Sequence, residues 1–133
     1  MTVSDARAVW FYKVTCPVCQ MAAPVATRLE QRHPGHLVGI GQDPPDRLDQ
    51  FAAGFGLSIP VMPDLPPYEA SEAYEISVVP TLVLVDGGAV VDIVESWDRD
   101  GYNRVSARLA GIIGSAAGTV SEDGDGLPSF RPG

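Results

Sequence analysis

The chain has 133 residues, 45% of them hydrophobic, and a formal net charge of −8. This length is enough for one domain with a single hydrophobic core that needs no disulfide bonds to hold it. The acidic excess argues against nonspecific binding to nucleic acid or to anionic membranes, because both require a basic surface.

Neither a membrane span nor an export signal stands out in the sequence. No window approaches the roughly 18 consecutive apolar residues of a transmembrane helix. The start, "MTVSDARAVW", lacks a cationic stretch followed by a long apolar run. We therefore expect a monomer that does not insert into membranes and is cytoplasmic as given, with export as the alternative if a signal segment precedes this sequence.

The first part of the chain predicts a strand, a helix and a second strand. Residues 8–14, "AVWFYKV", are apolar and rich in aromatic and β-branched side chains, which is typical of a buried strand. Apolar residues then recur at helical spacing over residues 17–33, with Pro24 as an internal kink. The apolar run Leu37–Gly41 predicts the next strand, so this unit requires a right-handed parallel crossover.

The rest of the chain predicts shorter elements and a hairpin. Residues 45–55 show a helical apolar face that ends at Gly56, followed by a short strand at 59–62 and a helix at 68–74. Two apolar runs joined by "DGG" at 86–88 indicate antiparallel strands. A last amphipathic helix covers 102–113, with Asp98 and Asp100 as possible caps.

Residues 114–133 differ from everything before them. They are small, acidic and glycine-rich, with too little apolar surface to offset the entropy cost of ordering. We therefore expect one domain at 1–113 and a disordered tail at 114–133.

The only cysteines, Cys16 and Cys19, stand between the first predicted strand and helix as "CPVC". A sulfur at a helix start lies near unpaired backbone N–H groups and the positive end of the helix dipole, which favour thiolate. Such positions can lower a cysteine pKa from about 8.5 to roughly 3.5–7.5, so Cys16 is the predicted nucleophile. Cys19 lies one turn further on and could resolve a mixed disulfide.

A zinc site is the main alternative, because His33 and His36 complete the pattern C-x2-C-x13-H-x2-H. The predicted helix, however, separates Cys19 from His33 by about 21 Å, too far for shared coordination. We therefore expect no metal site. A CxxC pair in a strand-helix-strand setting indicates redox chemistry instead.

Three features over residues 9–113 resemble thioredoxin-fold proteins. They are "CPVC" after an aromatic-rich strand, a proline five residues past the second cysteine, and "VVPT" at 78–81, which is similar to the cis-proline loop. Residues 44–74 resemble the insertion of the TlpA-like and redoxin branch. The resemblance implies an α/β fold: a central mixed parallel and antiparallel sheet flanked by helices, with a helix-strand insertion before the cis-proline loop.

The resemblance also implies a function, thiol-disulfide oxidoreductase activity. Cys16 and Cys19 would be catalytic, the Val79–Pro80 peptide would be cis, and the Val79 backbone would pair with a substrate chain. The implied substrate-binding residues are Thr15, Pro17, Val79 and Pro80. Implied partners are protein or small-molecule thiols and disulfides, plus a redox partner that the sequence does not identify. No cofactor is implied beyond the Cys16–Cys19 disulfide itself.

The sequence departs from the family pattern around the cysteines. Thr15 replaces a common tryptophan, and Trp10 and Ala22 stand where relatives carry proton-accepting acids. Solvent, or an acid such as Asp43 or Glu72, is the candidate substitute. "FYKVTCPVC" also resembles part of the peroxiredoxin pattern, without the threonine that assists the peroxide. A peroxide-handling redoxin and a noncatalytic binding domain of the same fold are the alternatives.

Overall fold

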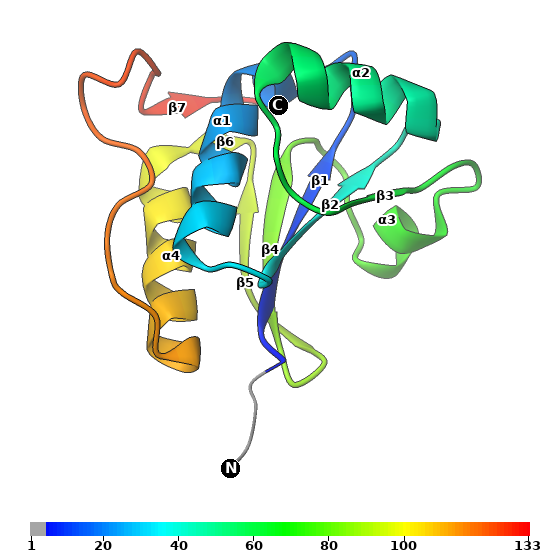
Figure 1. Cartoon of the computed structure of the whole chain (residues 1–133). Helices are drawn as coiled ribbons and strands as arrows, with labels where there is room; N and C mark the ends of the chain where they lie inside the picture. The colour runs from blue at the N-terminus through cyan, green and yellow to red at the C-terminus, as the bar shows by residue number, and fades with distance from the viewer. Residues whose placement is uncertain (1–4) are drawn as a thin grey trace.

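A mixed β-sheet forms the centre of the computed structural model, which describes residues 5–133 of the chain (Figure 1). The strand order is β3-β2-β1-β4-β5. β1 pairs in parallel with β2, and β2 with β3, whereas β1–β4 and β4–β5 are antiparallel. The strands are β1 (Arg7–Tyr12), β2 (Leu37–Gly41), β3 (Val61–Pro63), β4 (Thr81–Asp86) and β5 (Ala89–Glu95). This mixed sheet confirms the predicted fold class.

Helices cover both faces of the sheet. On one face, α1 (Pro17–Arg32), α2 (Pro45–Phe55) and α4 (Arg99–Ile113) bury a large core against Trp10 and Tyr12 of β1. Val9 and Phe11, which alternate with them, face a smaller core beside α3 (Glu69–Ala73) (Figure 1). The alternation follows from the two-residue period of a strand. The central strand β1 is therefore buried on both faces, as its apolar run predicts.

Element boundaries differ from the predicted ones by a few residues. β1 ends at Tyr12, and residues 13–16 form the loop that leads into α1. The predicted stop of α2 is present, since Gly56 adopts a left-handed conformation with φ of 71°. Gly87 and Gly88 likewise have positive φ in the β4–β5 turn. α4 begins at Arg99, three residues before the predicted start at 102, because its first turn continues directly from Asp98.

The segment 114–133 is ordered in the structure, in contrast to the disorder expected from its composition. Val120 is buried, and β7 (Phe130–Arg131) pairs with β6 (Trp97–Asp98). The buried Arg99 guanidinium donates hydrogen bonds to Ser121, Asp123, Asp125 and the Leu127 carbonyl. Polar hydrogen bonds, rather than apolar burial, hold most of this segment in the structure.

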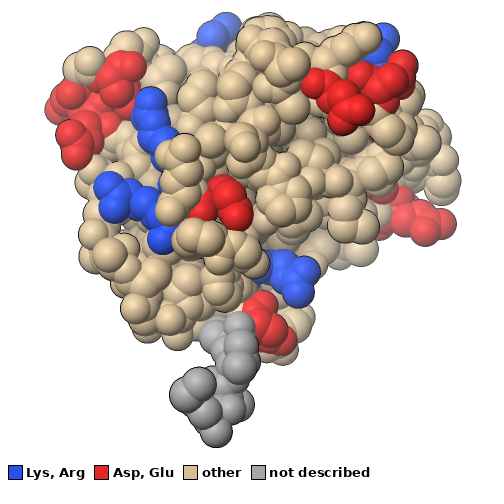
Figure 2. Space-filling view, in the orientation of Figure 1, with Lys and Arg blue, Asp and Glu red and all other residues tan. Residues whose placement is uncertain are grey.

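Charge is unevenly distributed over the surface. Acidic side chains gather over α2 and over the loop that follows α4, and the surface between these two areas is mostly uncharged (Figure 2).

In residues 5–133, each helix is too short or too polar to cross a lipid bilayer.

Candidate functional site

Cys16 lies where β1 leads into α1, at the carboxyl ends of the parallel strands. This edge is the usual place for a site in sheets with parallel strands, because the loops there converge. Asp43, just after β2, accepts a hydrogen bond from the Val14 backbone N–H at 2.9 Å. The loop that carries Cys16 is thereby fastened to the neighbouring strand connection.

The Cys16 side chain caps α1. Its Sγ accepts a hydrogen bond from the Cys19 backbone N–H at 3.1 Å, and its thiol lies 3.5 Å from the Val79 carbonyl oxygen. A hydrogen bond from the Cys19 thiol, together with backbone N–H groups of the first turn, lowers the pKa of Cys16 to about 6. The half-buried Cys16 is therefore largely thiolate near neutral pH.

Cys19 has the opposite environment. It is fully buried beneath the first turn of α1, and burial is the main cause that raises its pKa well above the ordinary thiol value. The hydrogen bond to Cys16 raises it further, because Cys19 must keep its proton in order to donate. The two cysteines are thus an exposed thiolate above a protected thiol.

The "VVPT" segment lies beside Cys16. The Val79–Pro80 peptide is cis, Val79 is half-buried and Pro80 is buried. Thr15 and Pro17, the chain neighbours of Cys16, are exposed. The structure therefore brings together all six residues that the sequence proposes for the site.

Buried aromatic side chains share the core with Cys19. Trp10 Nε1 donates a 2.9 Å hydrogen bond to the Tyr102 hydroxyl, and both residues are fully buried. Burial raises the pKa of Tyr102, and the two cysteines add to this shift. Tyr102 therefore stays protonated and cannot serve as a proton acceptor at neutral pH.

The two candidate substitute acids have other surroundings. Asp43 bonds to the Val14 backbone, and Glu72 lies on the short helix α3, beside a hollow bordered by Gln42 and Tyr68. The strongest influences on the pKa of Cys19 are burial, Cys16 and backbone hydrogen bonds. A role for either acid stays a prediction.

His33, which follows the last residue of α1, also makes side-chain hydrogen bonds in the core. It is fully buried, and its two ring nitrogens hydrogen-bond the hydroxyls of Ser106 and Ser115 at 2.8 and 2.7 Å. Both ring nitrogens are occupied by these structural contacts. Within residues 5–133 there is no cluster of three or more His, Cys, Asp or Glu side chains that could hold a metal ion.

The sequence did not identify three residues that lie near the site: Ser96, Arg131 and Gly133. Ser96 donates its backbone N–H to the Pro80 carbonyl, while its hydroxyl accepts a hydrogen bond from the Gly133 N–H. Arg131, from β7, makes a 3.9 Å contact with the Met21 sulfur on α1, and its charge also lowers the pKa of Cys16. These residues are far from the cysteines in sequence, and no local pattern marks them.

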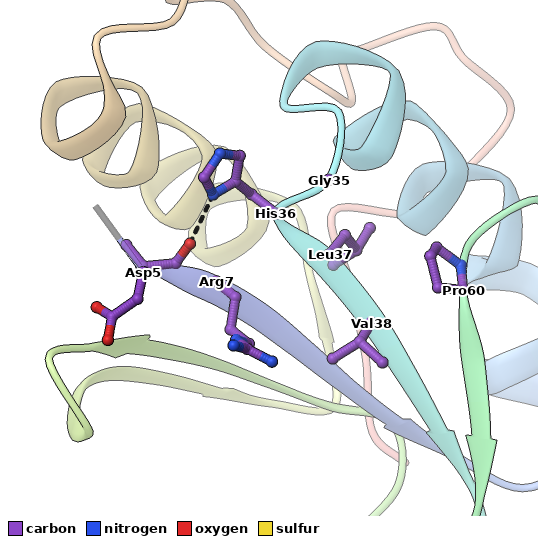
Figure 3. A pocket seen from close by; sticks show the side chains of 8 residues that line it. Asp5, Arg7, Gly35, His36, Leu37, Val38 and Pro60 are labelled. Atoms are coloured by element: carbon purple, nitrogen blue, oxygen red, sulfur yellow. Dashed lines mark hydrogen bonds between the residues drawn. The ribbon is translucent and has the colours of Figure 1, made fainter. Parts of the chain in front are cut away.

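A surface hollow lies away from the cysteines, at the start of β1. Its lining includes Arg7, His36, Leu37 and Pro60 (Figure 3). The His36 ring bonds the Ala6 carbonyl there at 2.7 Å. Because Cys16 follows the other end of β1, this hollow is separate from the thiol site.

Comparison with solved structures identifies the fold of the chain. No protein-family model matches the chain, and no curated protein matches it. Solved structures do. DsbF of Mycobacterium tuberculosis, solved in mixed oxidised and reduced forms, matches at TM-score 0.69 and 23% identity over 80% of this chain and 82% of that one.

Two further structures agree. A secreted M. tuberculosis disulfide oxidoreductase homologous to E. coli DsbE matches at TM-score 0.64 and 19% identity, over 80% of this chain and 81% of that chain. A thiol:disulfide interchange protein of the thioredoxin family from Chlorobium tepidum matches at TM-score 0.61 and 20% identity, over 76% and 77%. Together with the sheet order and the position of the cysteines, these likenesses show that the chain has the thioredoxin-like fold.

Proposed function

We propose that the protein is a thiol-disulfide oxidoreductase that exchanges disulfides through Cys16 and Cys19. The observation that carries the proposal is that the pKa values of the two thiols are shifted in opposite directions. Cys16, half-exposed, has a pKa lowered to about 6, and Cys19, buried one turn away, keeps its proton. An exposed thiolate and a protected thiol are what a two-step exchange needs.

The reaction proceeds by two displacements at sulfur. The Cys16 thiolate attacks one sulfur of a substrate disulfide, forms a mixed disulfide and releases the other substrate sulfur as a thiolate that takes up a proton. Cys19 then loses its proton to solvent and attacks Cys16, which releases the second substrate thiol. Two electrons pass from the cysteine pair to the substrate, and the reverse sequence oxidises a substrate dithiol.

The backbone of the cis-proline loop beside Cys16 suits an extended substrate chain. Val79 presents backbone groups next to the sulfur, so a substrate strand could pair with it as with a sheet edge. Thr15 and Pro17, both exposed, would border the other side. We infer that the cysteine pair carries the electrons without a bound cofactor and that a single chain suffices.

The test is exchange with a model disulfide. Wild-type protein should reduce a protein disulfide such as that of insulin, and also glutathione disulfide, in the presence of a dithiol reductant. Cys16→Ser should abolish both reactions. Cys19→Ser should stop after the first displacement and accumulate a mixed disulfide, detectable as a mass increase equal to the bound partner.

Two outcomes would contradict this proposal. If wild-type protein exchanges neither disulfide, the chain is a binding domain that has kept the fold. If hydroperoxide oxidises Cys16 far faster than it oxidises free thiol, while disulfides react slowly, the protein is a peroxide-handling redoxin.

A further inference from the structure

Residues 130–133, which we call the strap, lie beside the cis-proline loop next to Cys16. Figure 1 shows β7 leading to the C label near the start of α1. A Cβ added to Gly133 would lie 2.2 Å from the Val79 carbonyl oxygen and 2.9 Å from its carbonyl carbon. The Gly133 Cα is therefore within about 3.7 Å of that oxygen, given a carbon–carbon bond of about 1.5 Å. The same oxygen lies 3.5 Å from Cys16 Sγ.

Ser96 anchors the tip of the strap to the cis-proline loop. Its hydroxyl accepts the Gly133 N–H at 3.0 Å, and its own N–H donates to the Pro80 carbonyl at 2.9 Å. Ser96 has a φ of 68°, which is uncommon for a residue with a side chain and marks a constrained position. One residue thus ties the strap to the loop that the proposed function uses for docking.

The strap is held at few points. Its four residues are exposed, and within residues 5–133 they are attached by the β6–β7 pairing, the Ser96 bond and the contact of Arg131 with Met21. Few buried contacts are typical of segments that open locally at low cost. The strap can therefore leave Val79 without unfolding the central sheet.

We propose that the strap determines substrate specificity by occupying the place of a substrate backbone on Val79. This inference rests on the proposed function. An extended polypeptide must displace Gly133 before it can pair with Val79, whereas a small disulfide reaches Cys16 without pairing. The protein therefore favours small disulfides over extended chains, relative to the same protein without the strap.

Gly133→Ala tests this with one methyl group. The added carbon cannot remain 2.2 Å from a carbonyl oxygen, so the tip of the strap must move off Val79. Gly111→Ala is the matched control, because its methyl meets no atom within 4 Å on the exposed side of α4. Ser96→Ala and removal of residues 130–133 release the strap by independent routes.

The measurement is the ratio of the rate on the insulin disulfide to the rate on glutathione disulfide. Loss of one anchoring hydrogen bond should raise this ratio about fivefold in Gly133→Ala and Ser96→Ala, and at least as much in the deletion. Gly111→Ala should leave the ratio as in wild type. Far-ultraviolet circular dichroism checks that each variant is folded.

An unchanged or lower ratio in the folded strap variants would overturn the inference. A lower ratio would mean that the strap builds the docking surface instead of occupying it. In both cases continued reaction with glutathione disulfide leaves the proposed function intact. Loss of both reactions in the wild-type protein would reject the proposed function instead.

Discussion

The thiol hydrogen bond between Cys19 and Cys16 links the acidities of the two residues. It is the largest cause of the lowered Cys16 pKa, ahead of the backbone bonds of the helix start. A helix start alone would therefore give a weaker acid than the pair does. The reactivity of the exposed sulfur depends on a buried neighbour that the substrate does not reach at first.

Replacing Cys19 should shift the titration of Cys16. In wild type, thiolate absorbance and alkylation of Cys16 should rise around pH 6. Cys19→Ala removes the donor, so the midpoint should move up toward the ordinary value of 9. Cys19→Ser keeps a hydroxyl donor and should fall between the two.

Titration of absorbance at 240 nm, checked by alkylation rate against pH, measures this shift. If Cys19→Ala keeps the wild-type midpoint, the helix start alone sets the acidity of Cys16.

At this scale the sequence predicted the position of the site better than its surroundings. A buried strand followed by Pro17 was enough to place Cys16 at a helix start, because strand and helix patterns are local. Tyr102 and Ser96 contact the site from more than 70 residues away, and only the packed structure brings them there. The polar partner of Trp10 could not be read from its neighbours in the sequence.

Among the elements, the segment after α4 depends most on a single side chain. The Arg99 guanidinium bonds four residues of that segment, and the Arg99 backbone N–H donates to the Ser129 carbonyl. Asn103, one turn further along α4, also bonds the backbone of Val120 and Ser121. α4 therefore serves as the support for the chain that leads to the strap.

Arg99→Met should loosen this segment and cost about 2 kcal/mol of unfolding free energy, because it leaves the buried Ser121 hydroxyl without its charged donor. Amides at 119–129 should exchange hydrogen faster, while those of β1 keep their protection. Arg108→Met is the control: its guanidinium is about half exposed in an ion pair with Asp92, so it should cost at most about 0.5 kcal/mol.

Urea denaturation and hydrogen exchange measure these effects. Equal losses in the two variants would mean that the Arg99 cluster is no more important than a surface ion pair.

The element predictions were most reliable where a period was clear. The strand, helix and hairpin patterns of residues 7–113 gave the correct fold, since apolar periodicity reports which face is buried. The same criterion gives no information on the contacts of 114–133, where Val120 is one of few buried apolar side chains and polar hydrogen bonds make most of the attachments. Hydrogen bonds between distant residues leave no periodic signal.

For the molecule as a whole, the acidity of Cys16 should set the balance between reduced and oxidised forms. A lowered thiol pKa stabilises the reduced protein relative to its disulfide and so makes the pair more oxidising. Thioredoxin has a cysteine pKa of about 7 and a potential of about −270 mV, and DsbA about 3.5 and about −120 mV. With a Cys16 pKa of about 6, the potential should lie between these values.

Equilibration in glutathione buffers of graded ratio, with the redox state read by alkylation and mass, gives the potential. A value more reducing than that of thioredoxin would show that a factor other than the Cys16 thiolate controls the pair.

The central position of β1 affects how the chain matures during synthesis. β1 pairs with β2, about 30 residues later, and with β4, more than 70 residues later. A chain made from its N-terminus exposes both thiols to the solvent before β4 and α4 can cover the core. Cys19, fully buried in the finished protein, is open to oxidants, metals and other thiols during that interval. The oxidants present where the chain is synthesised thus reach a pair of cysteines that the folded protein would only half expose.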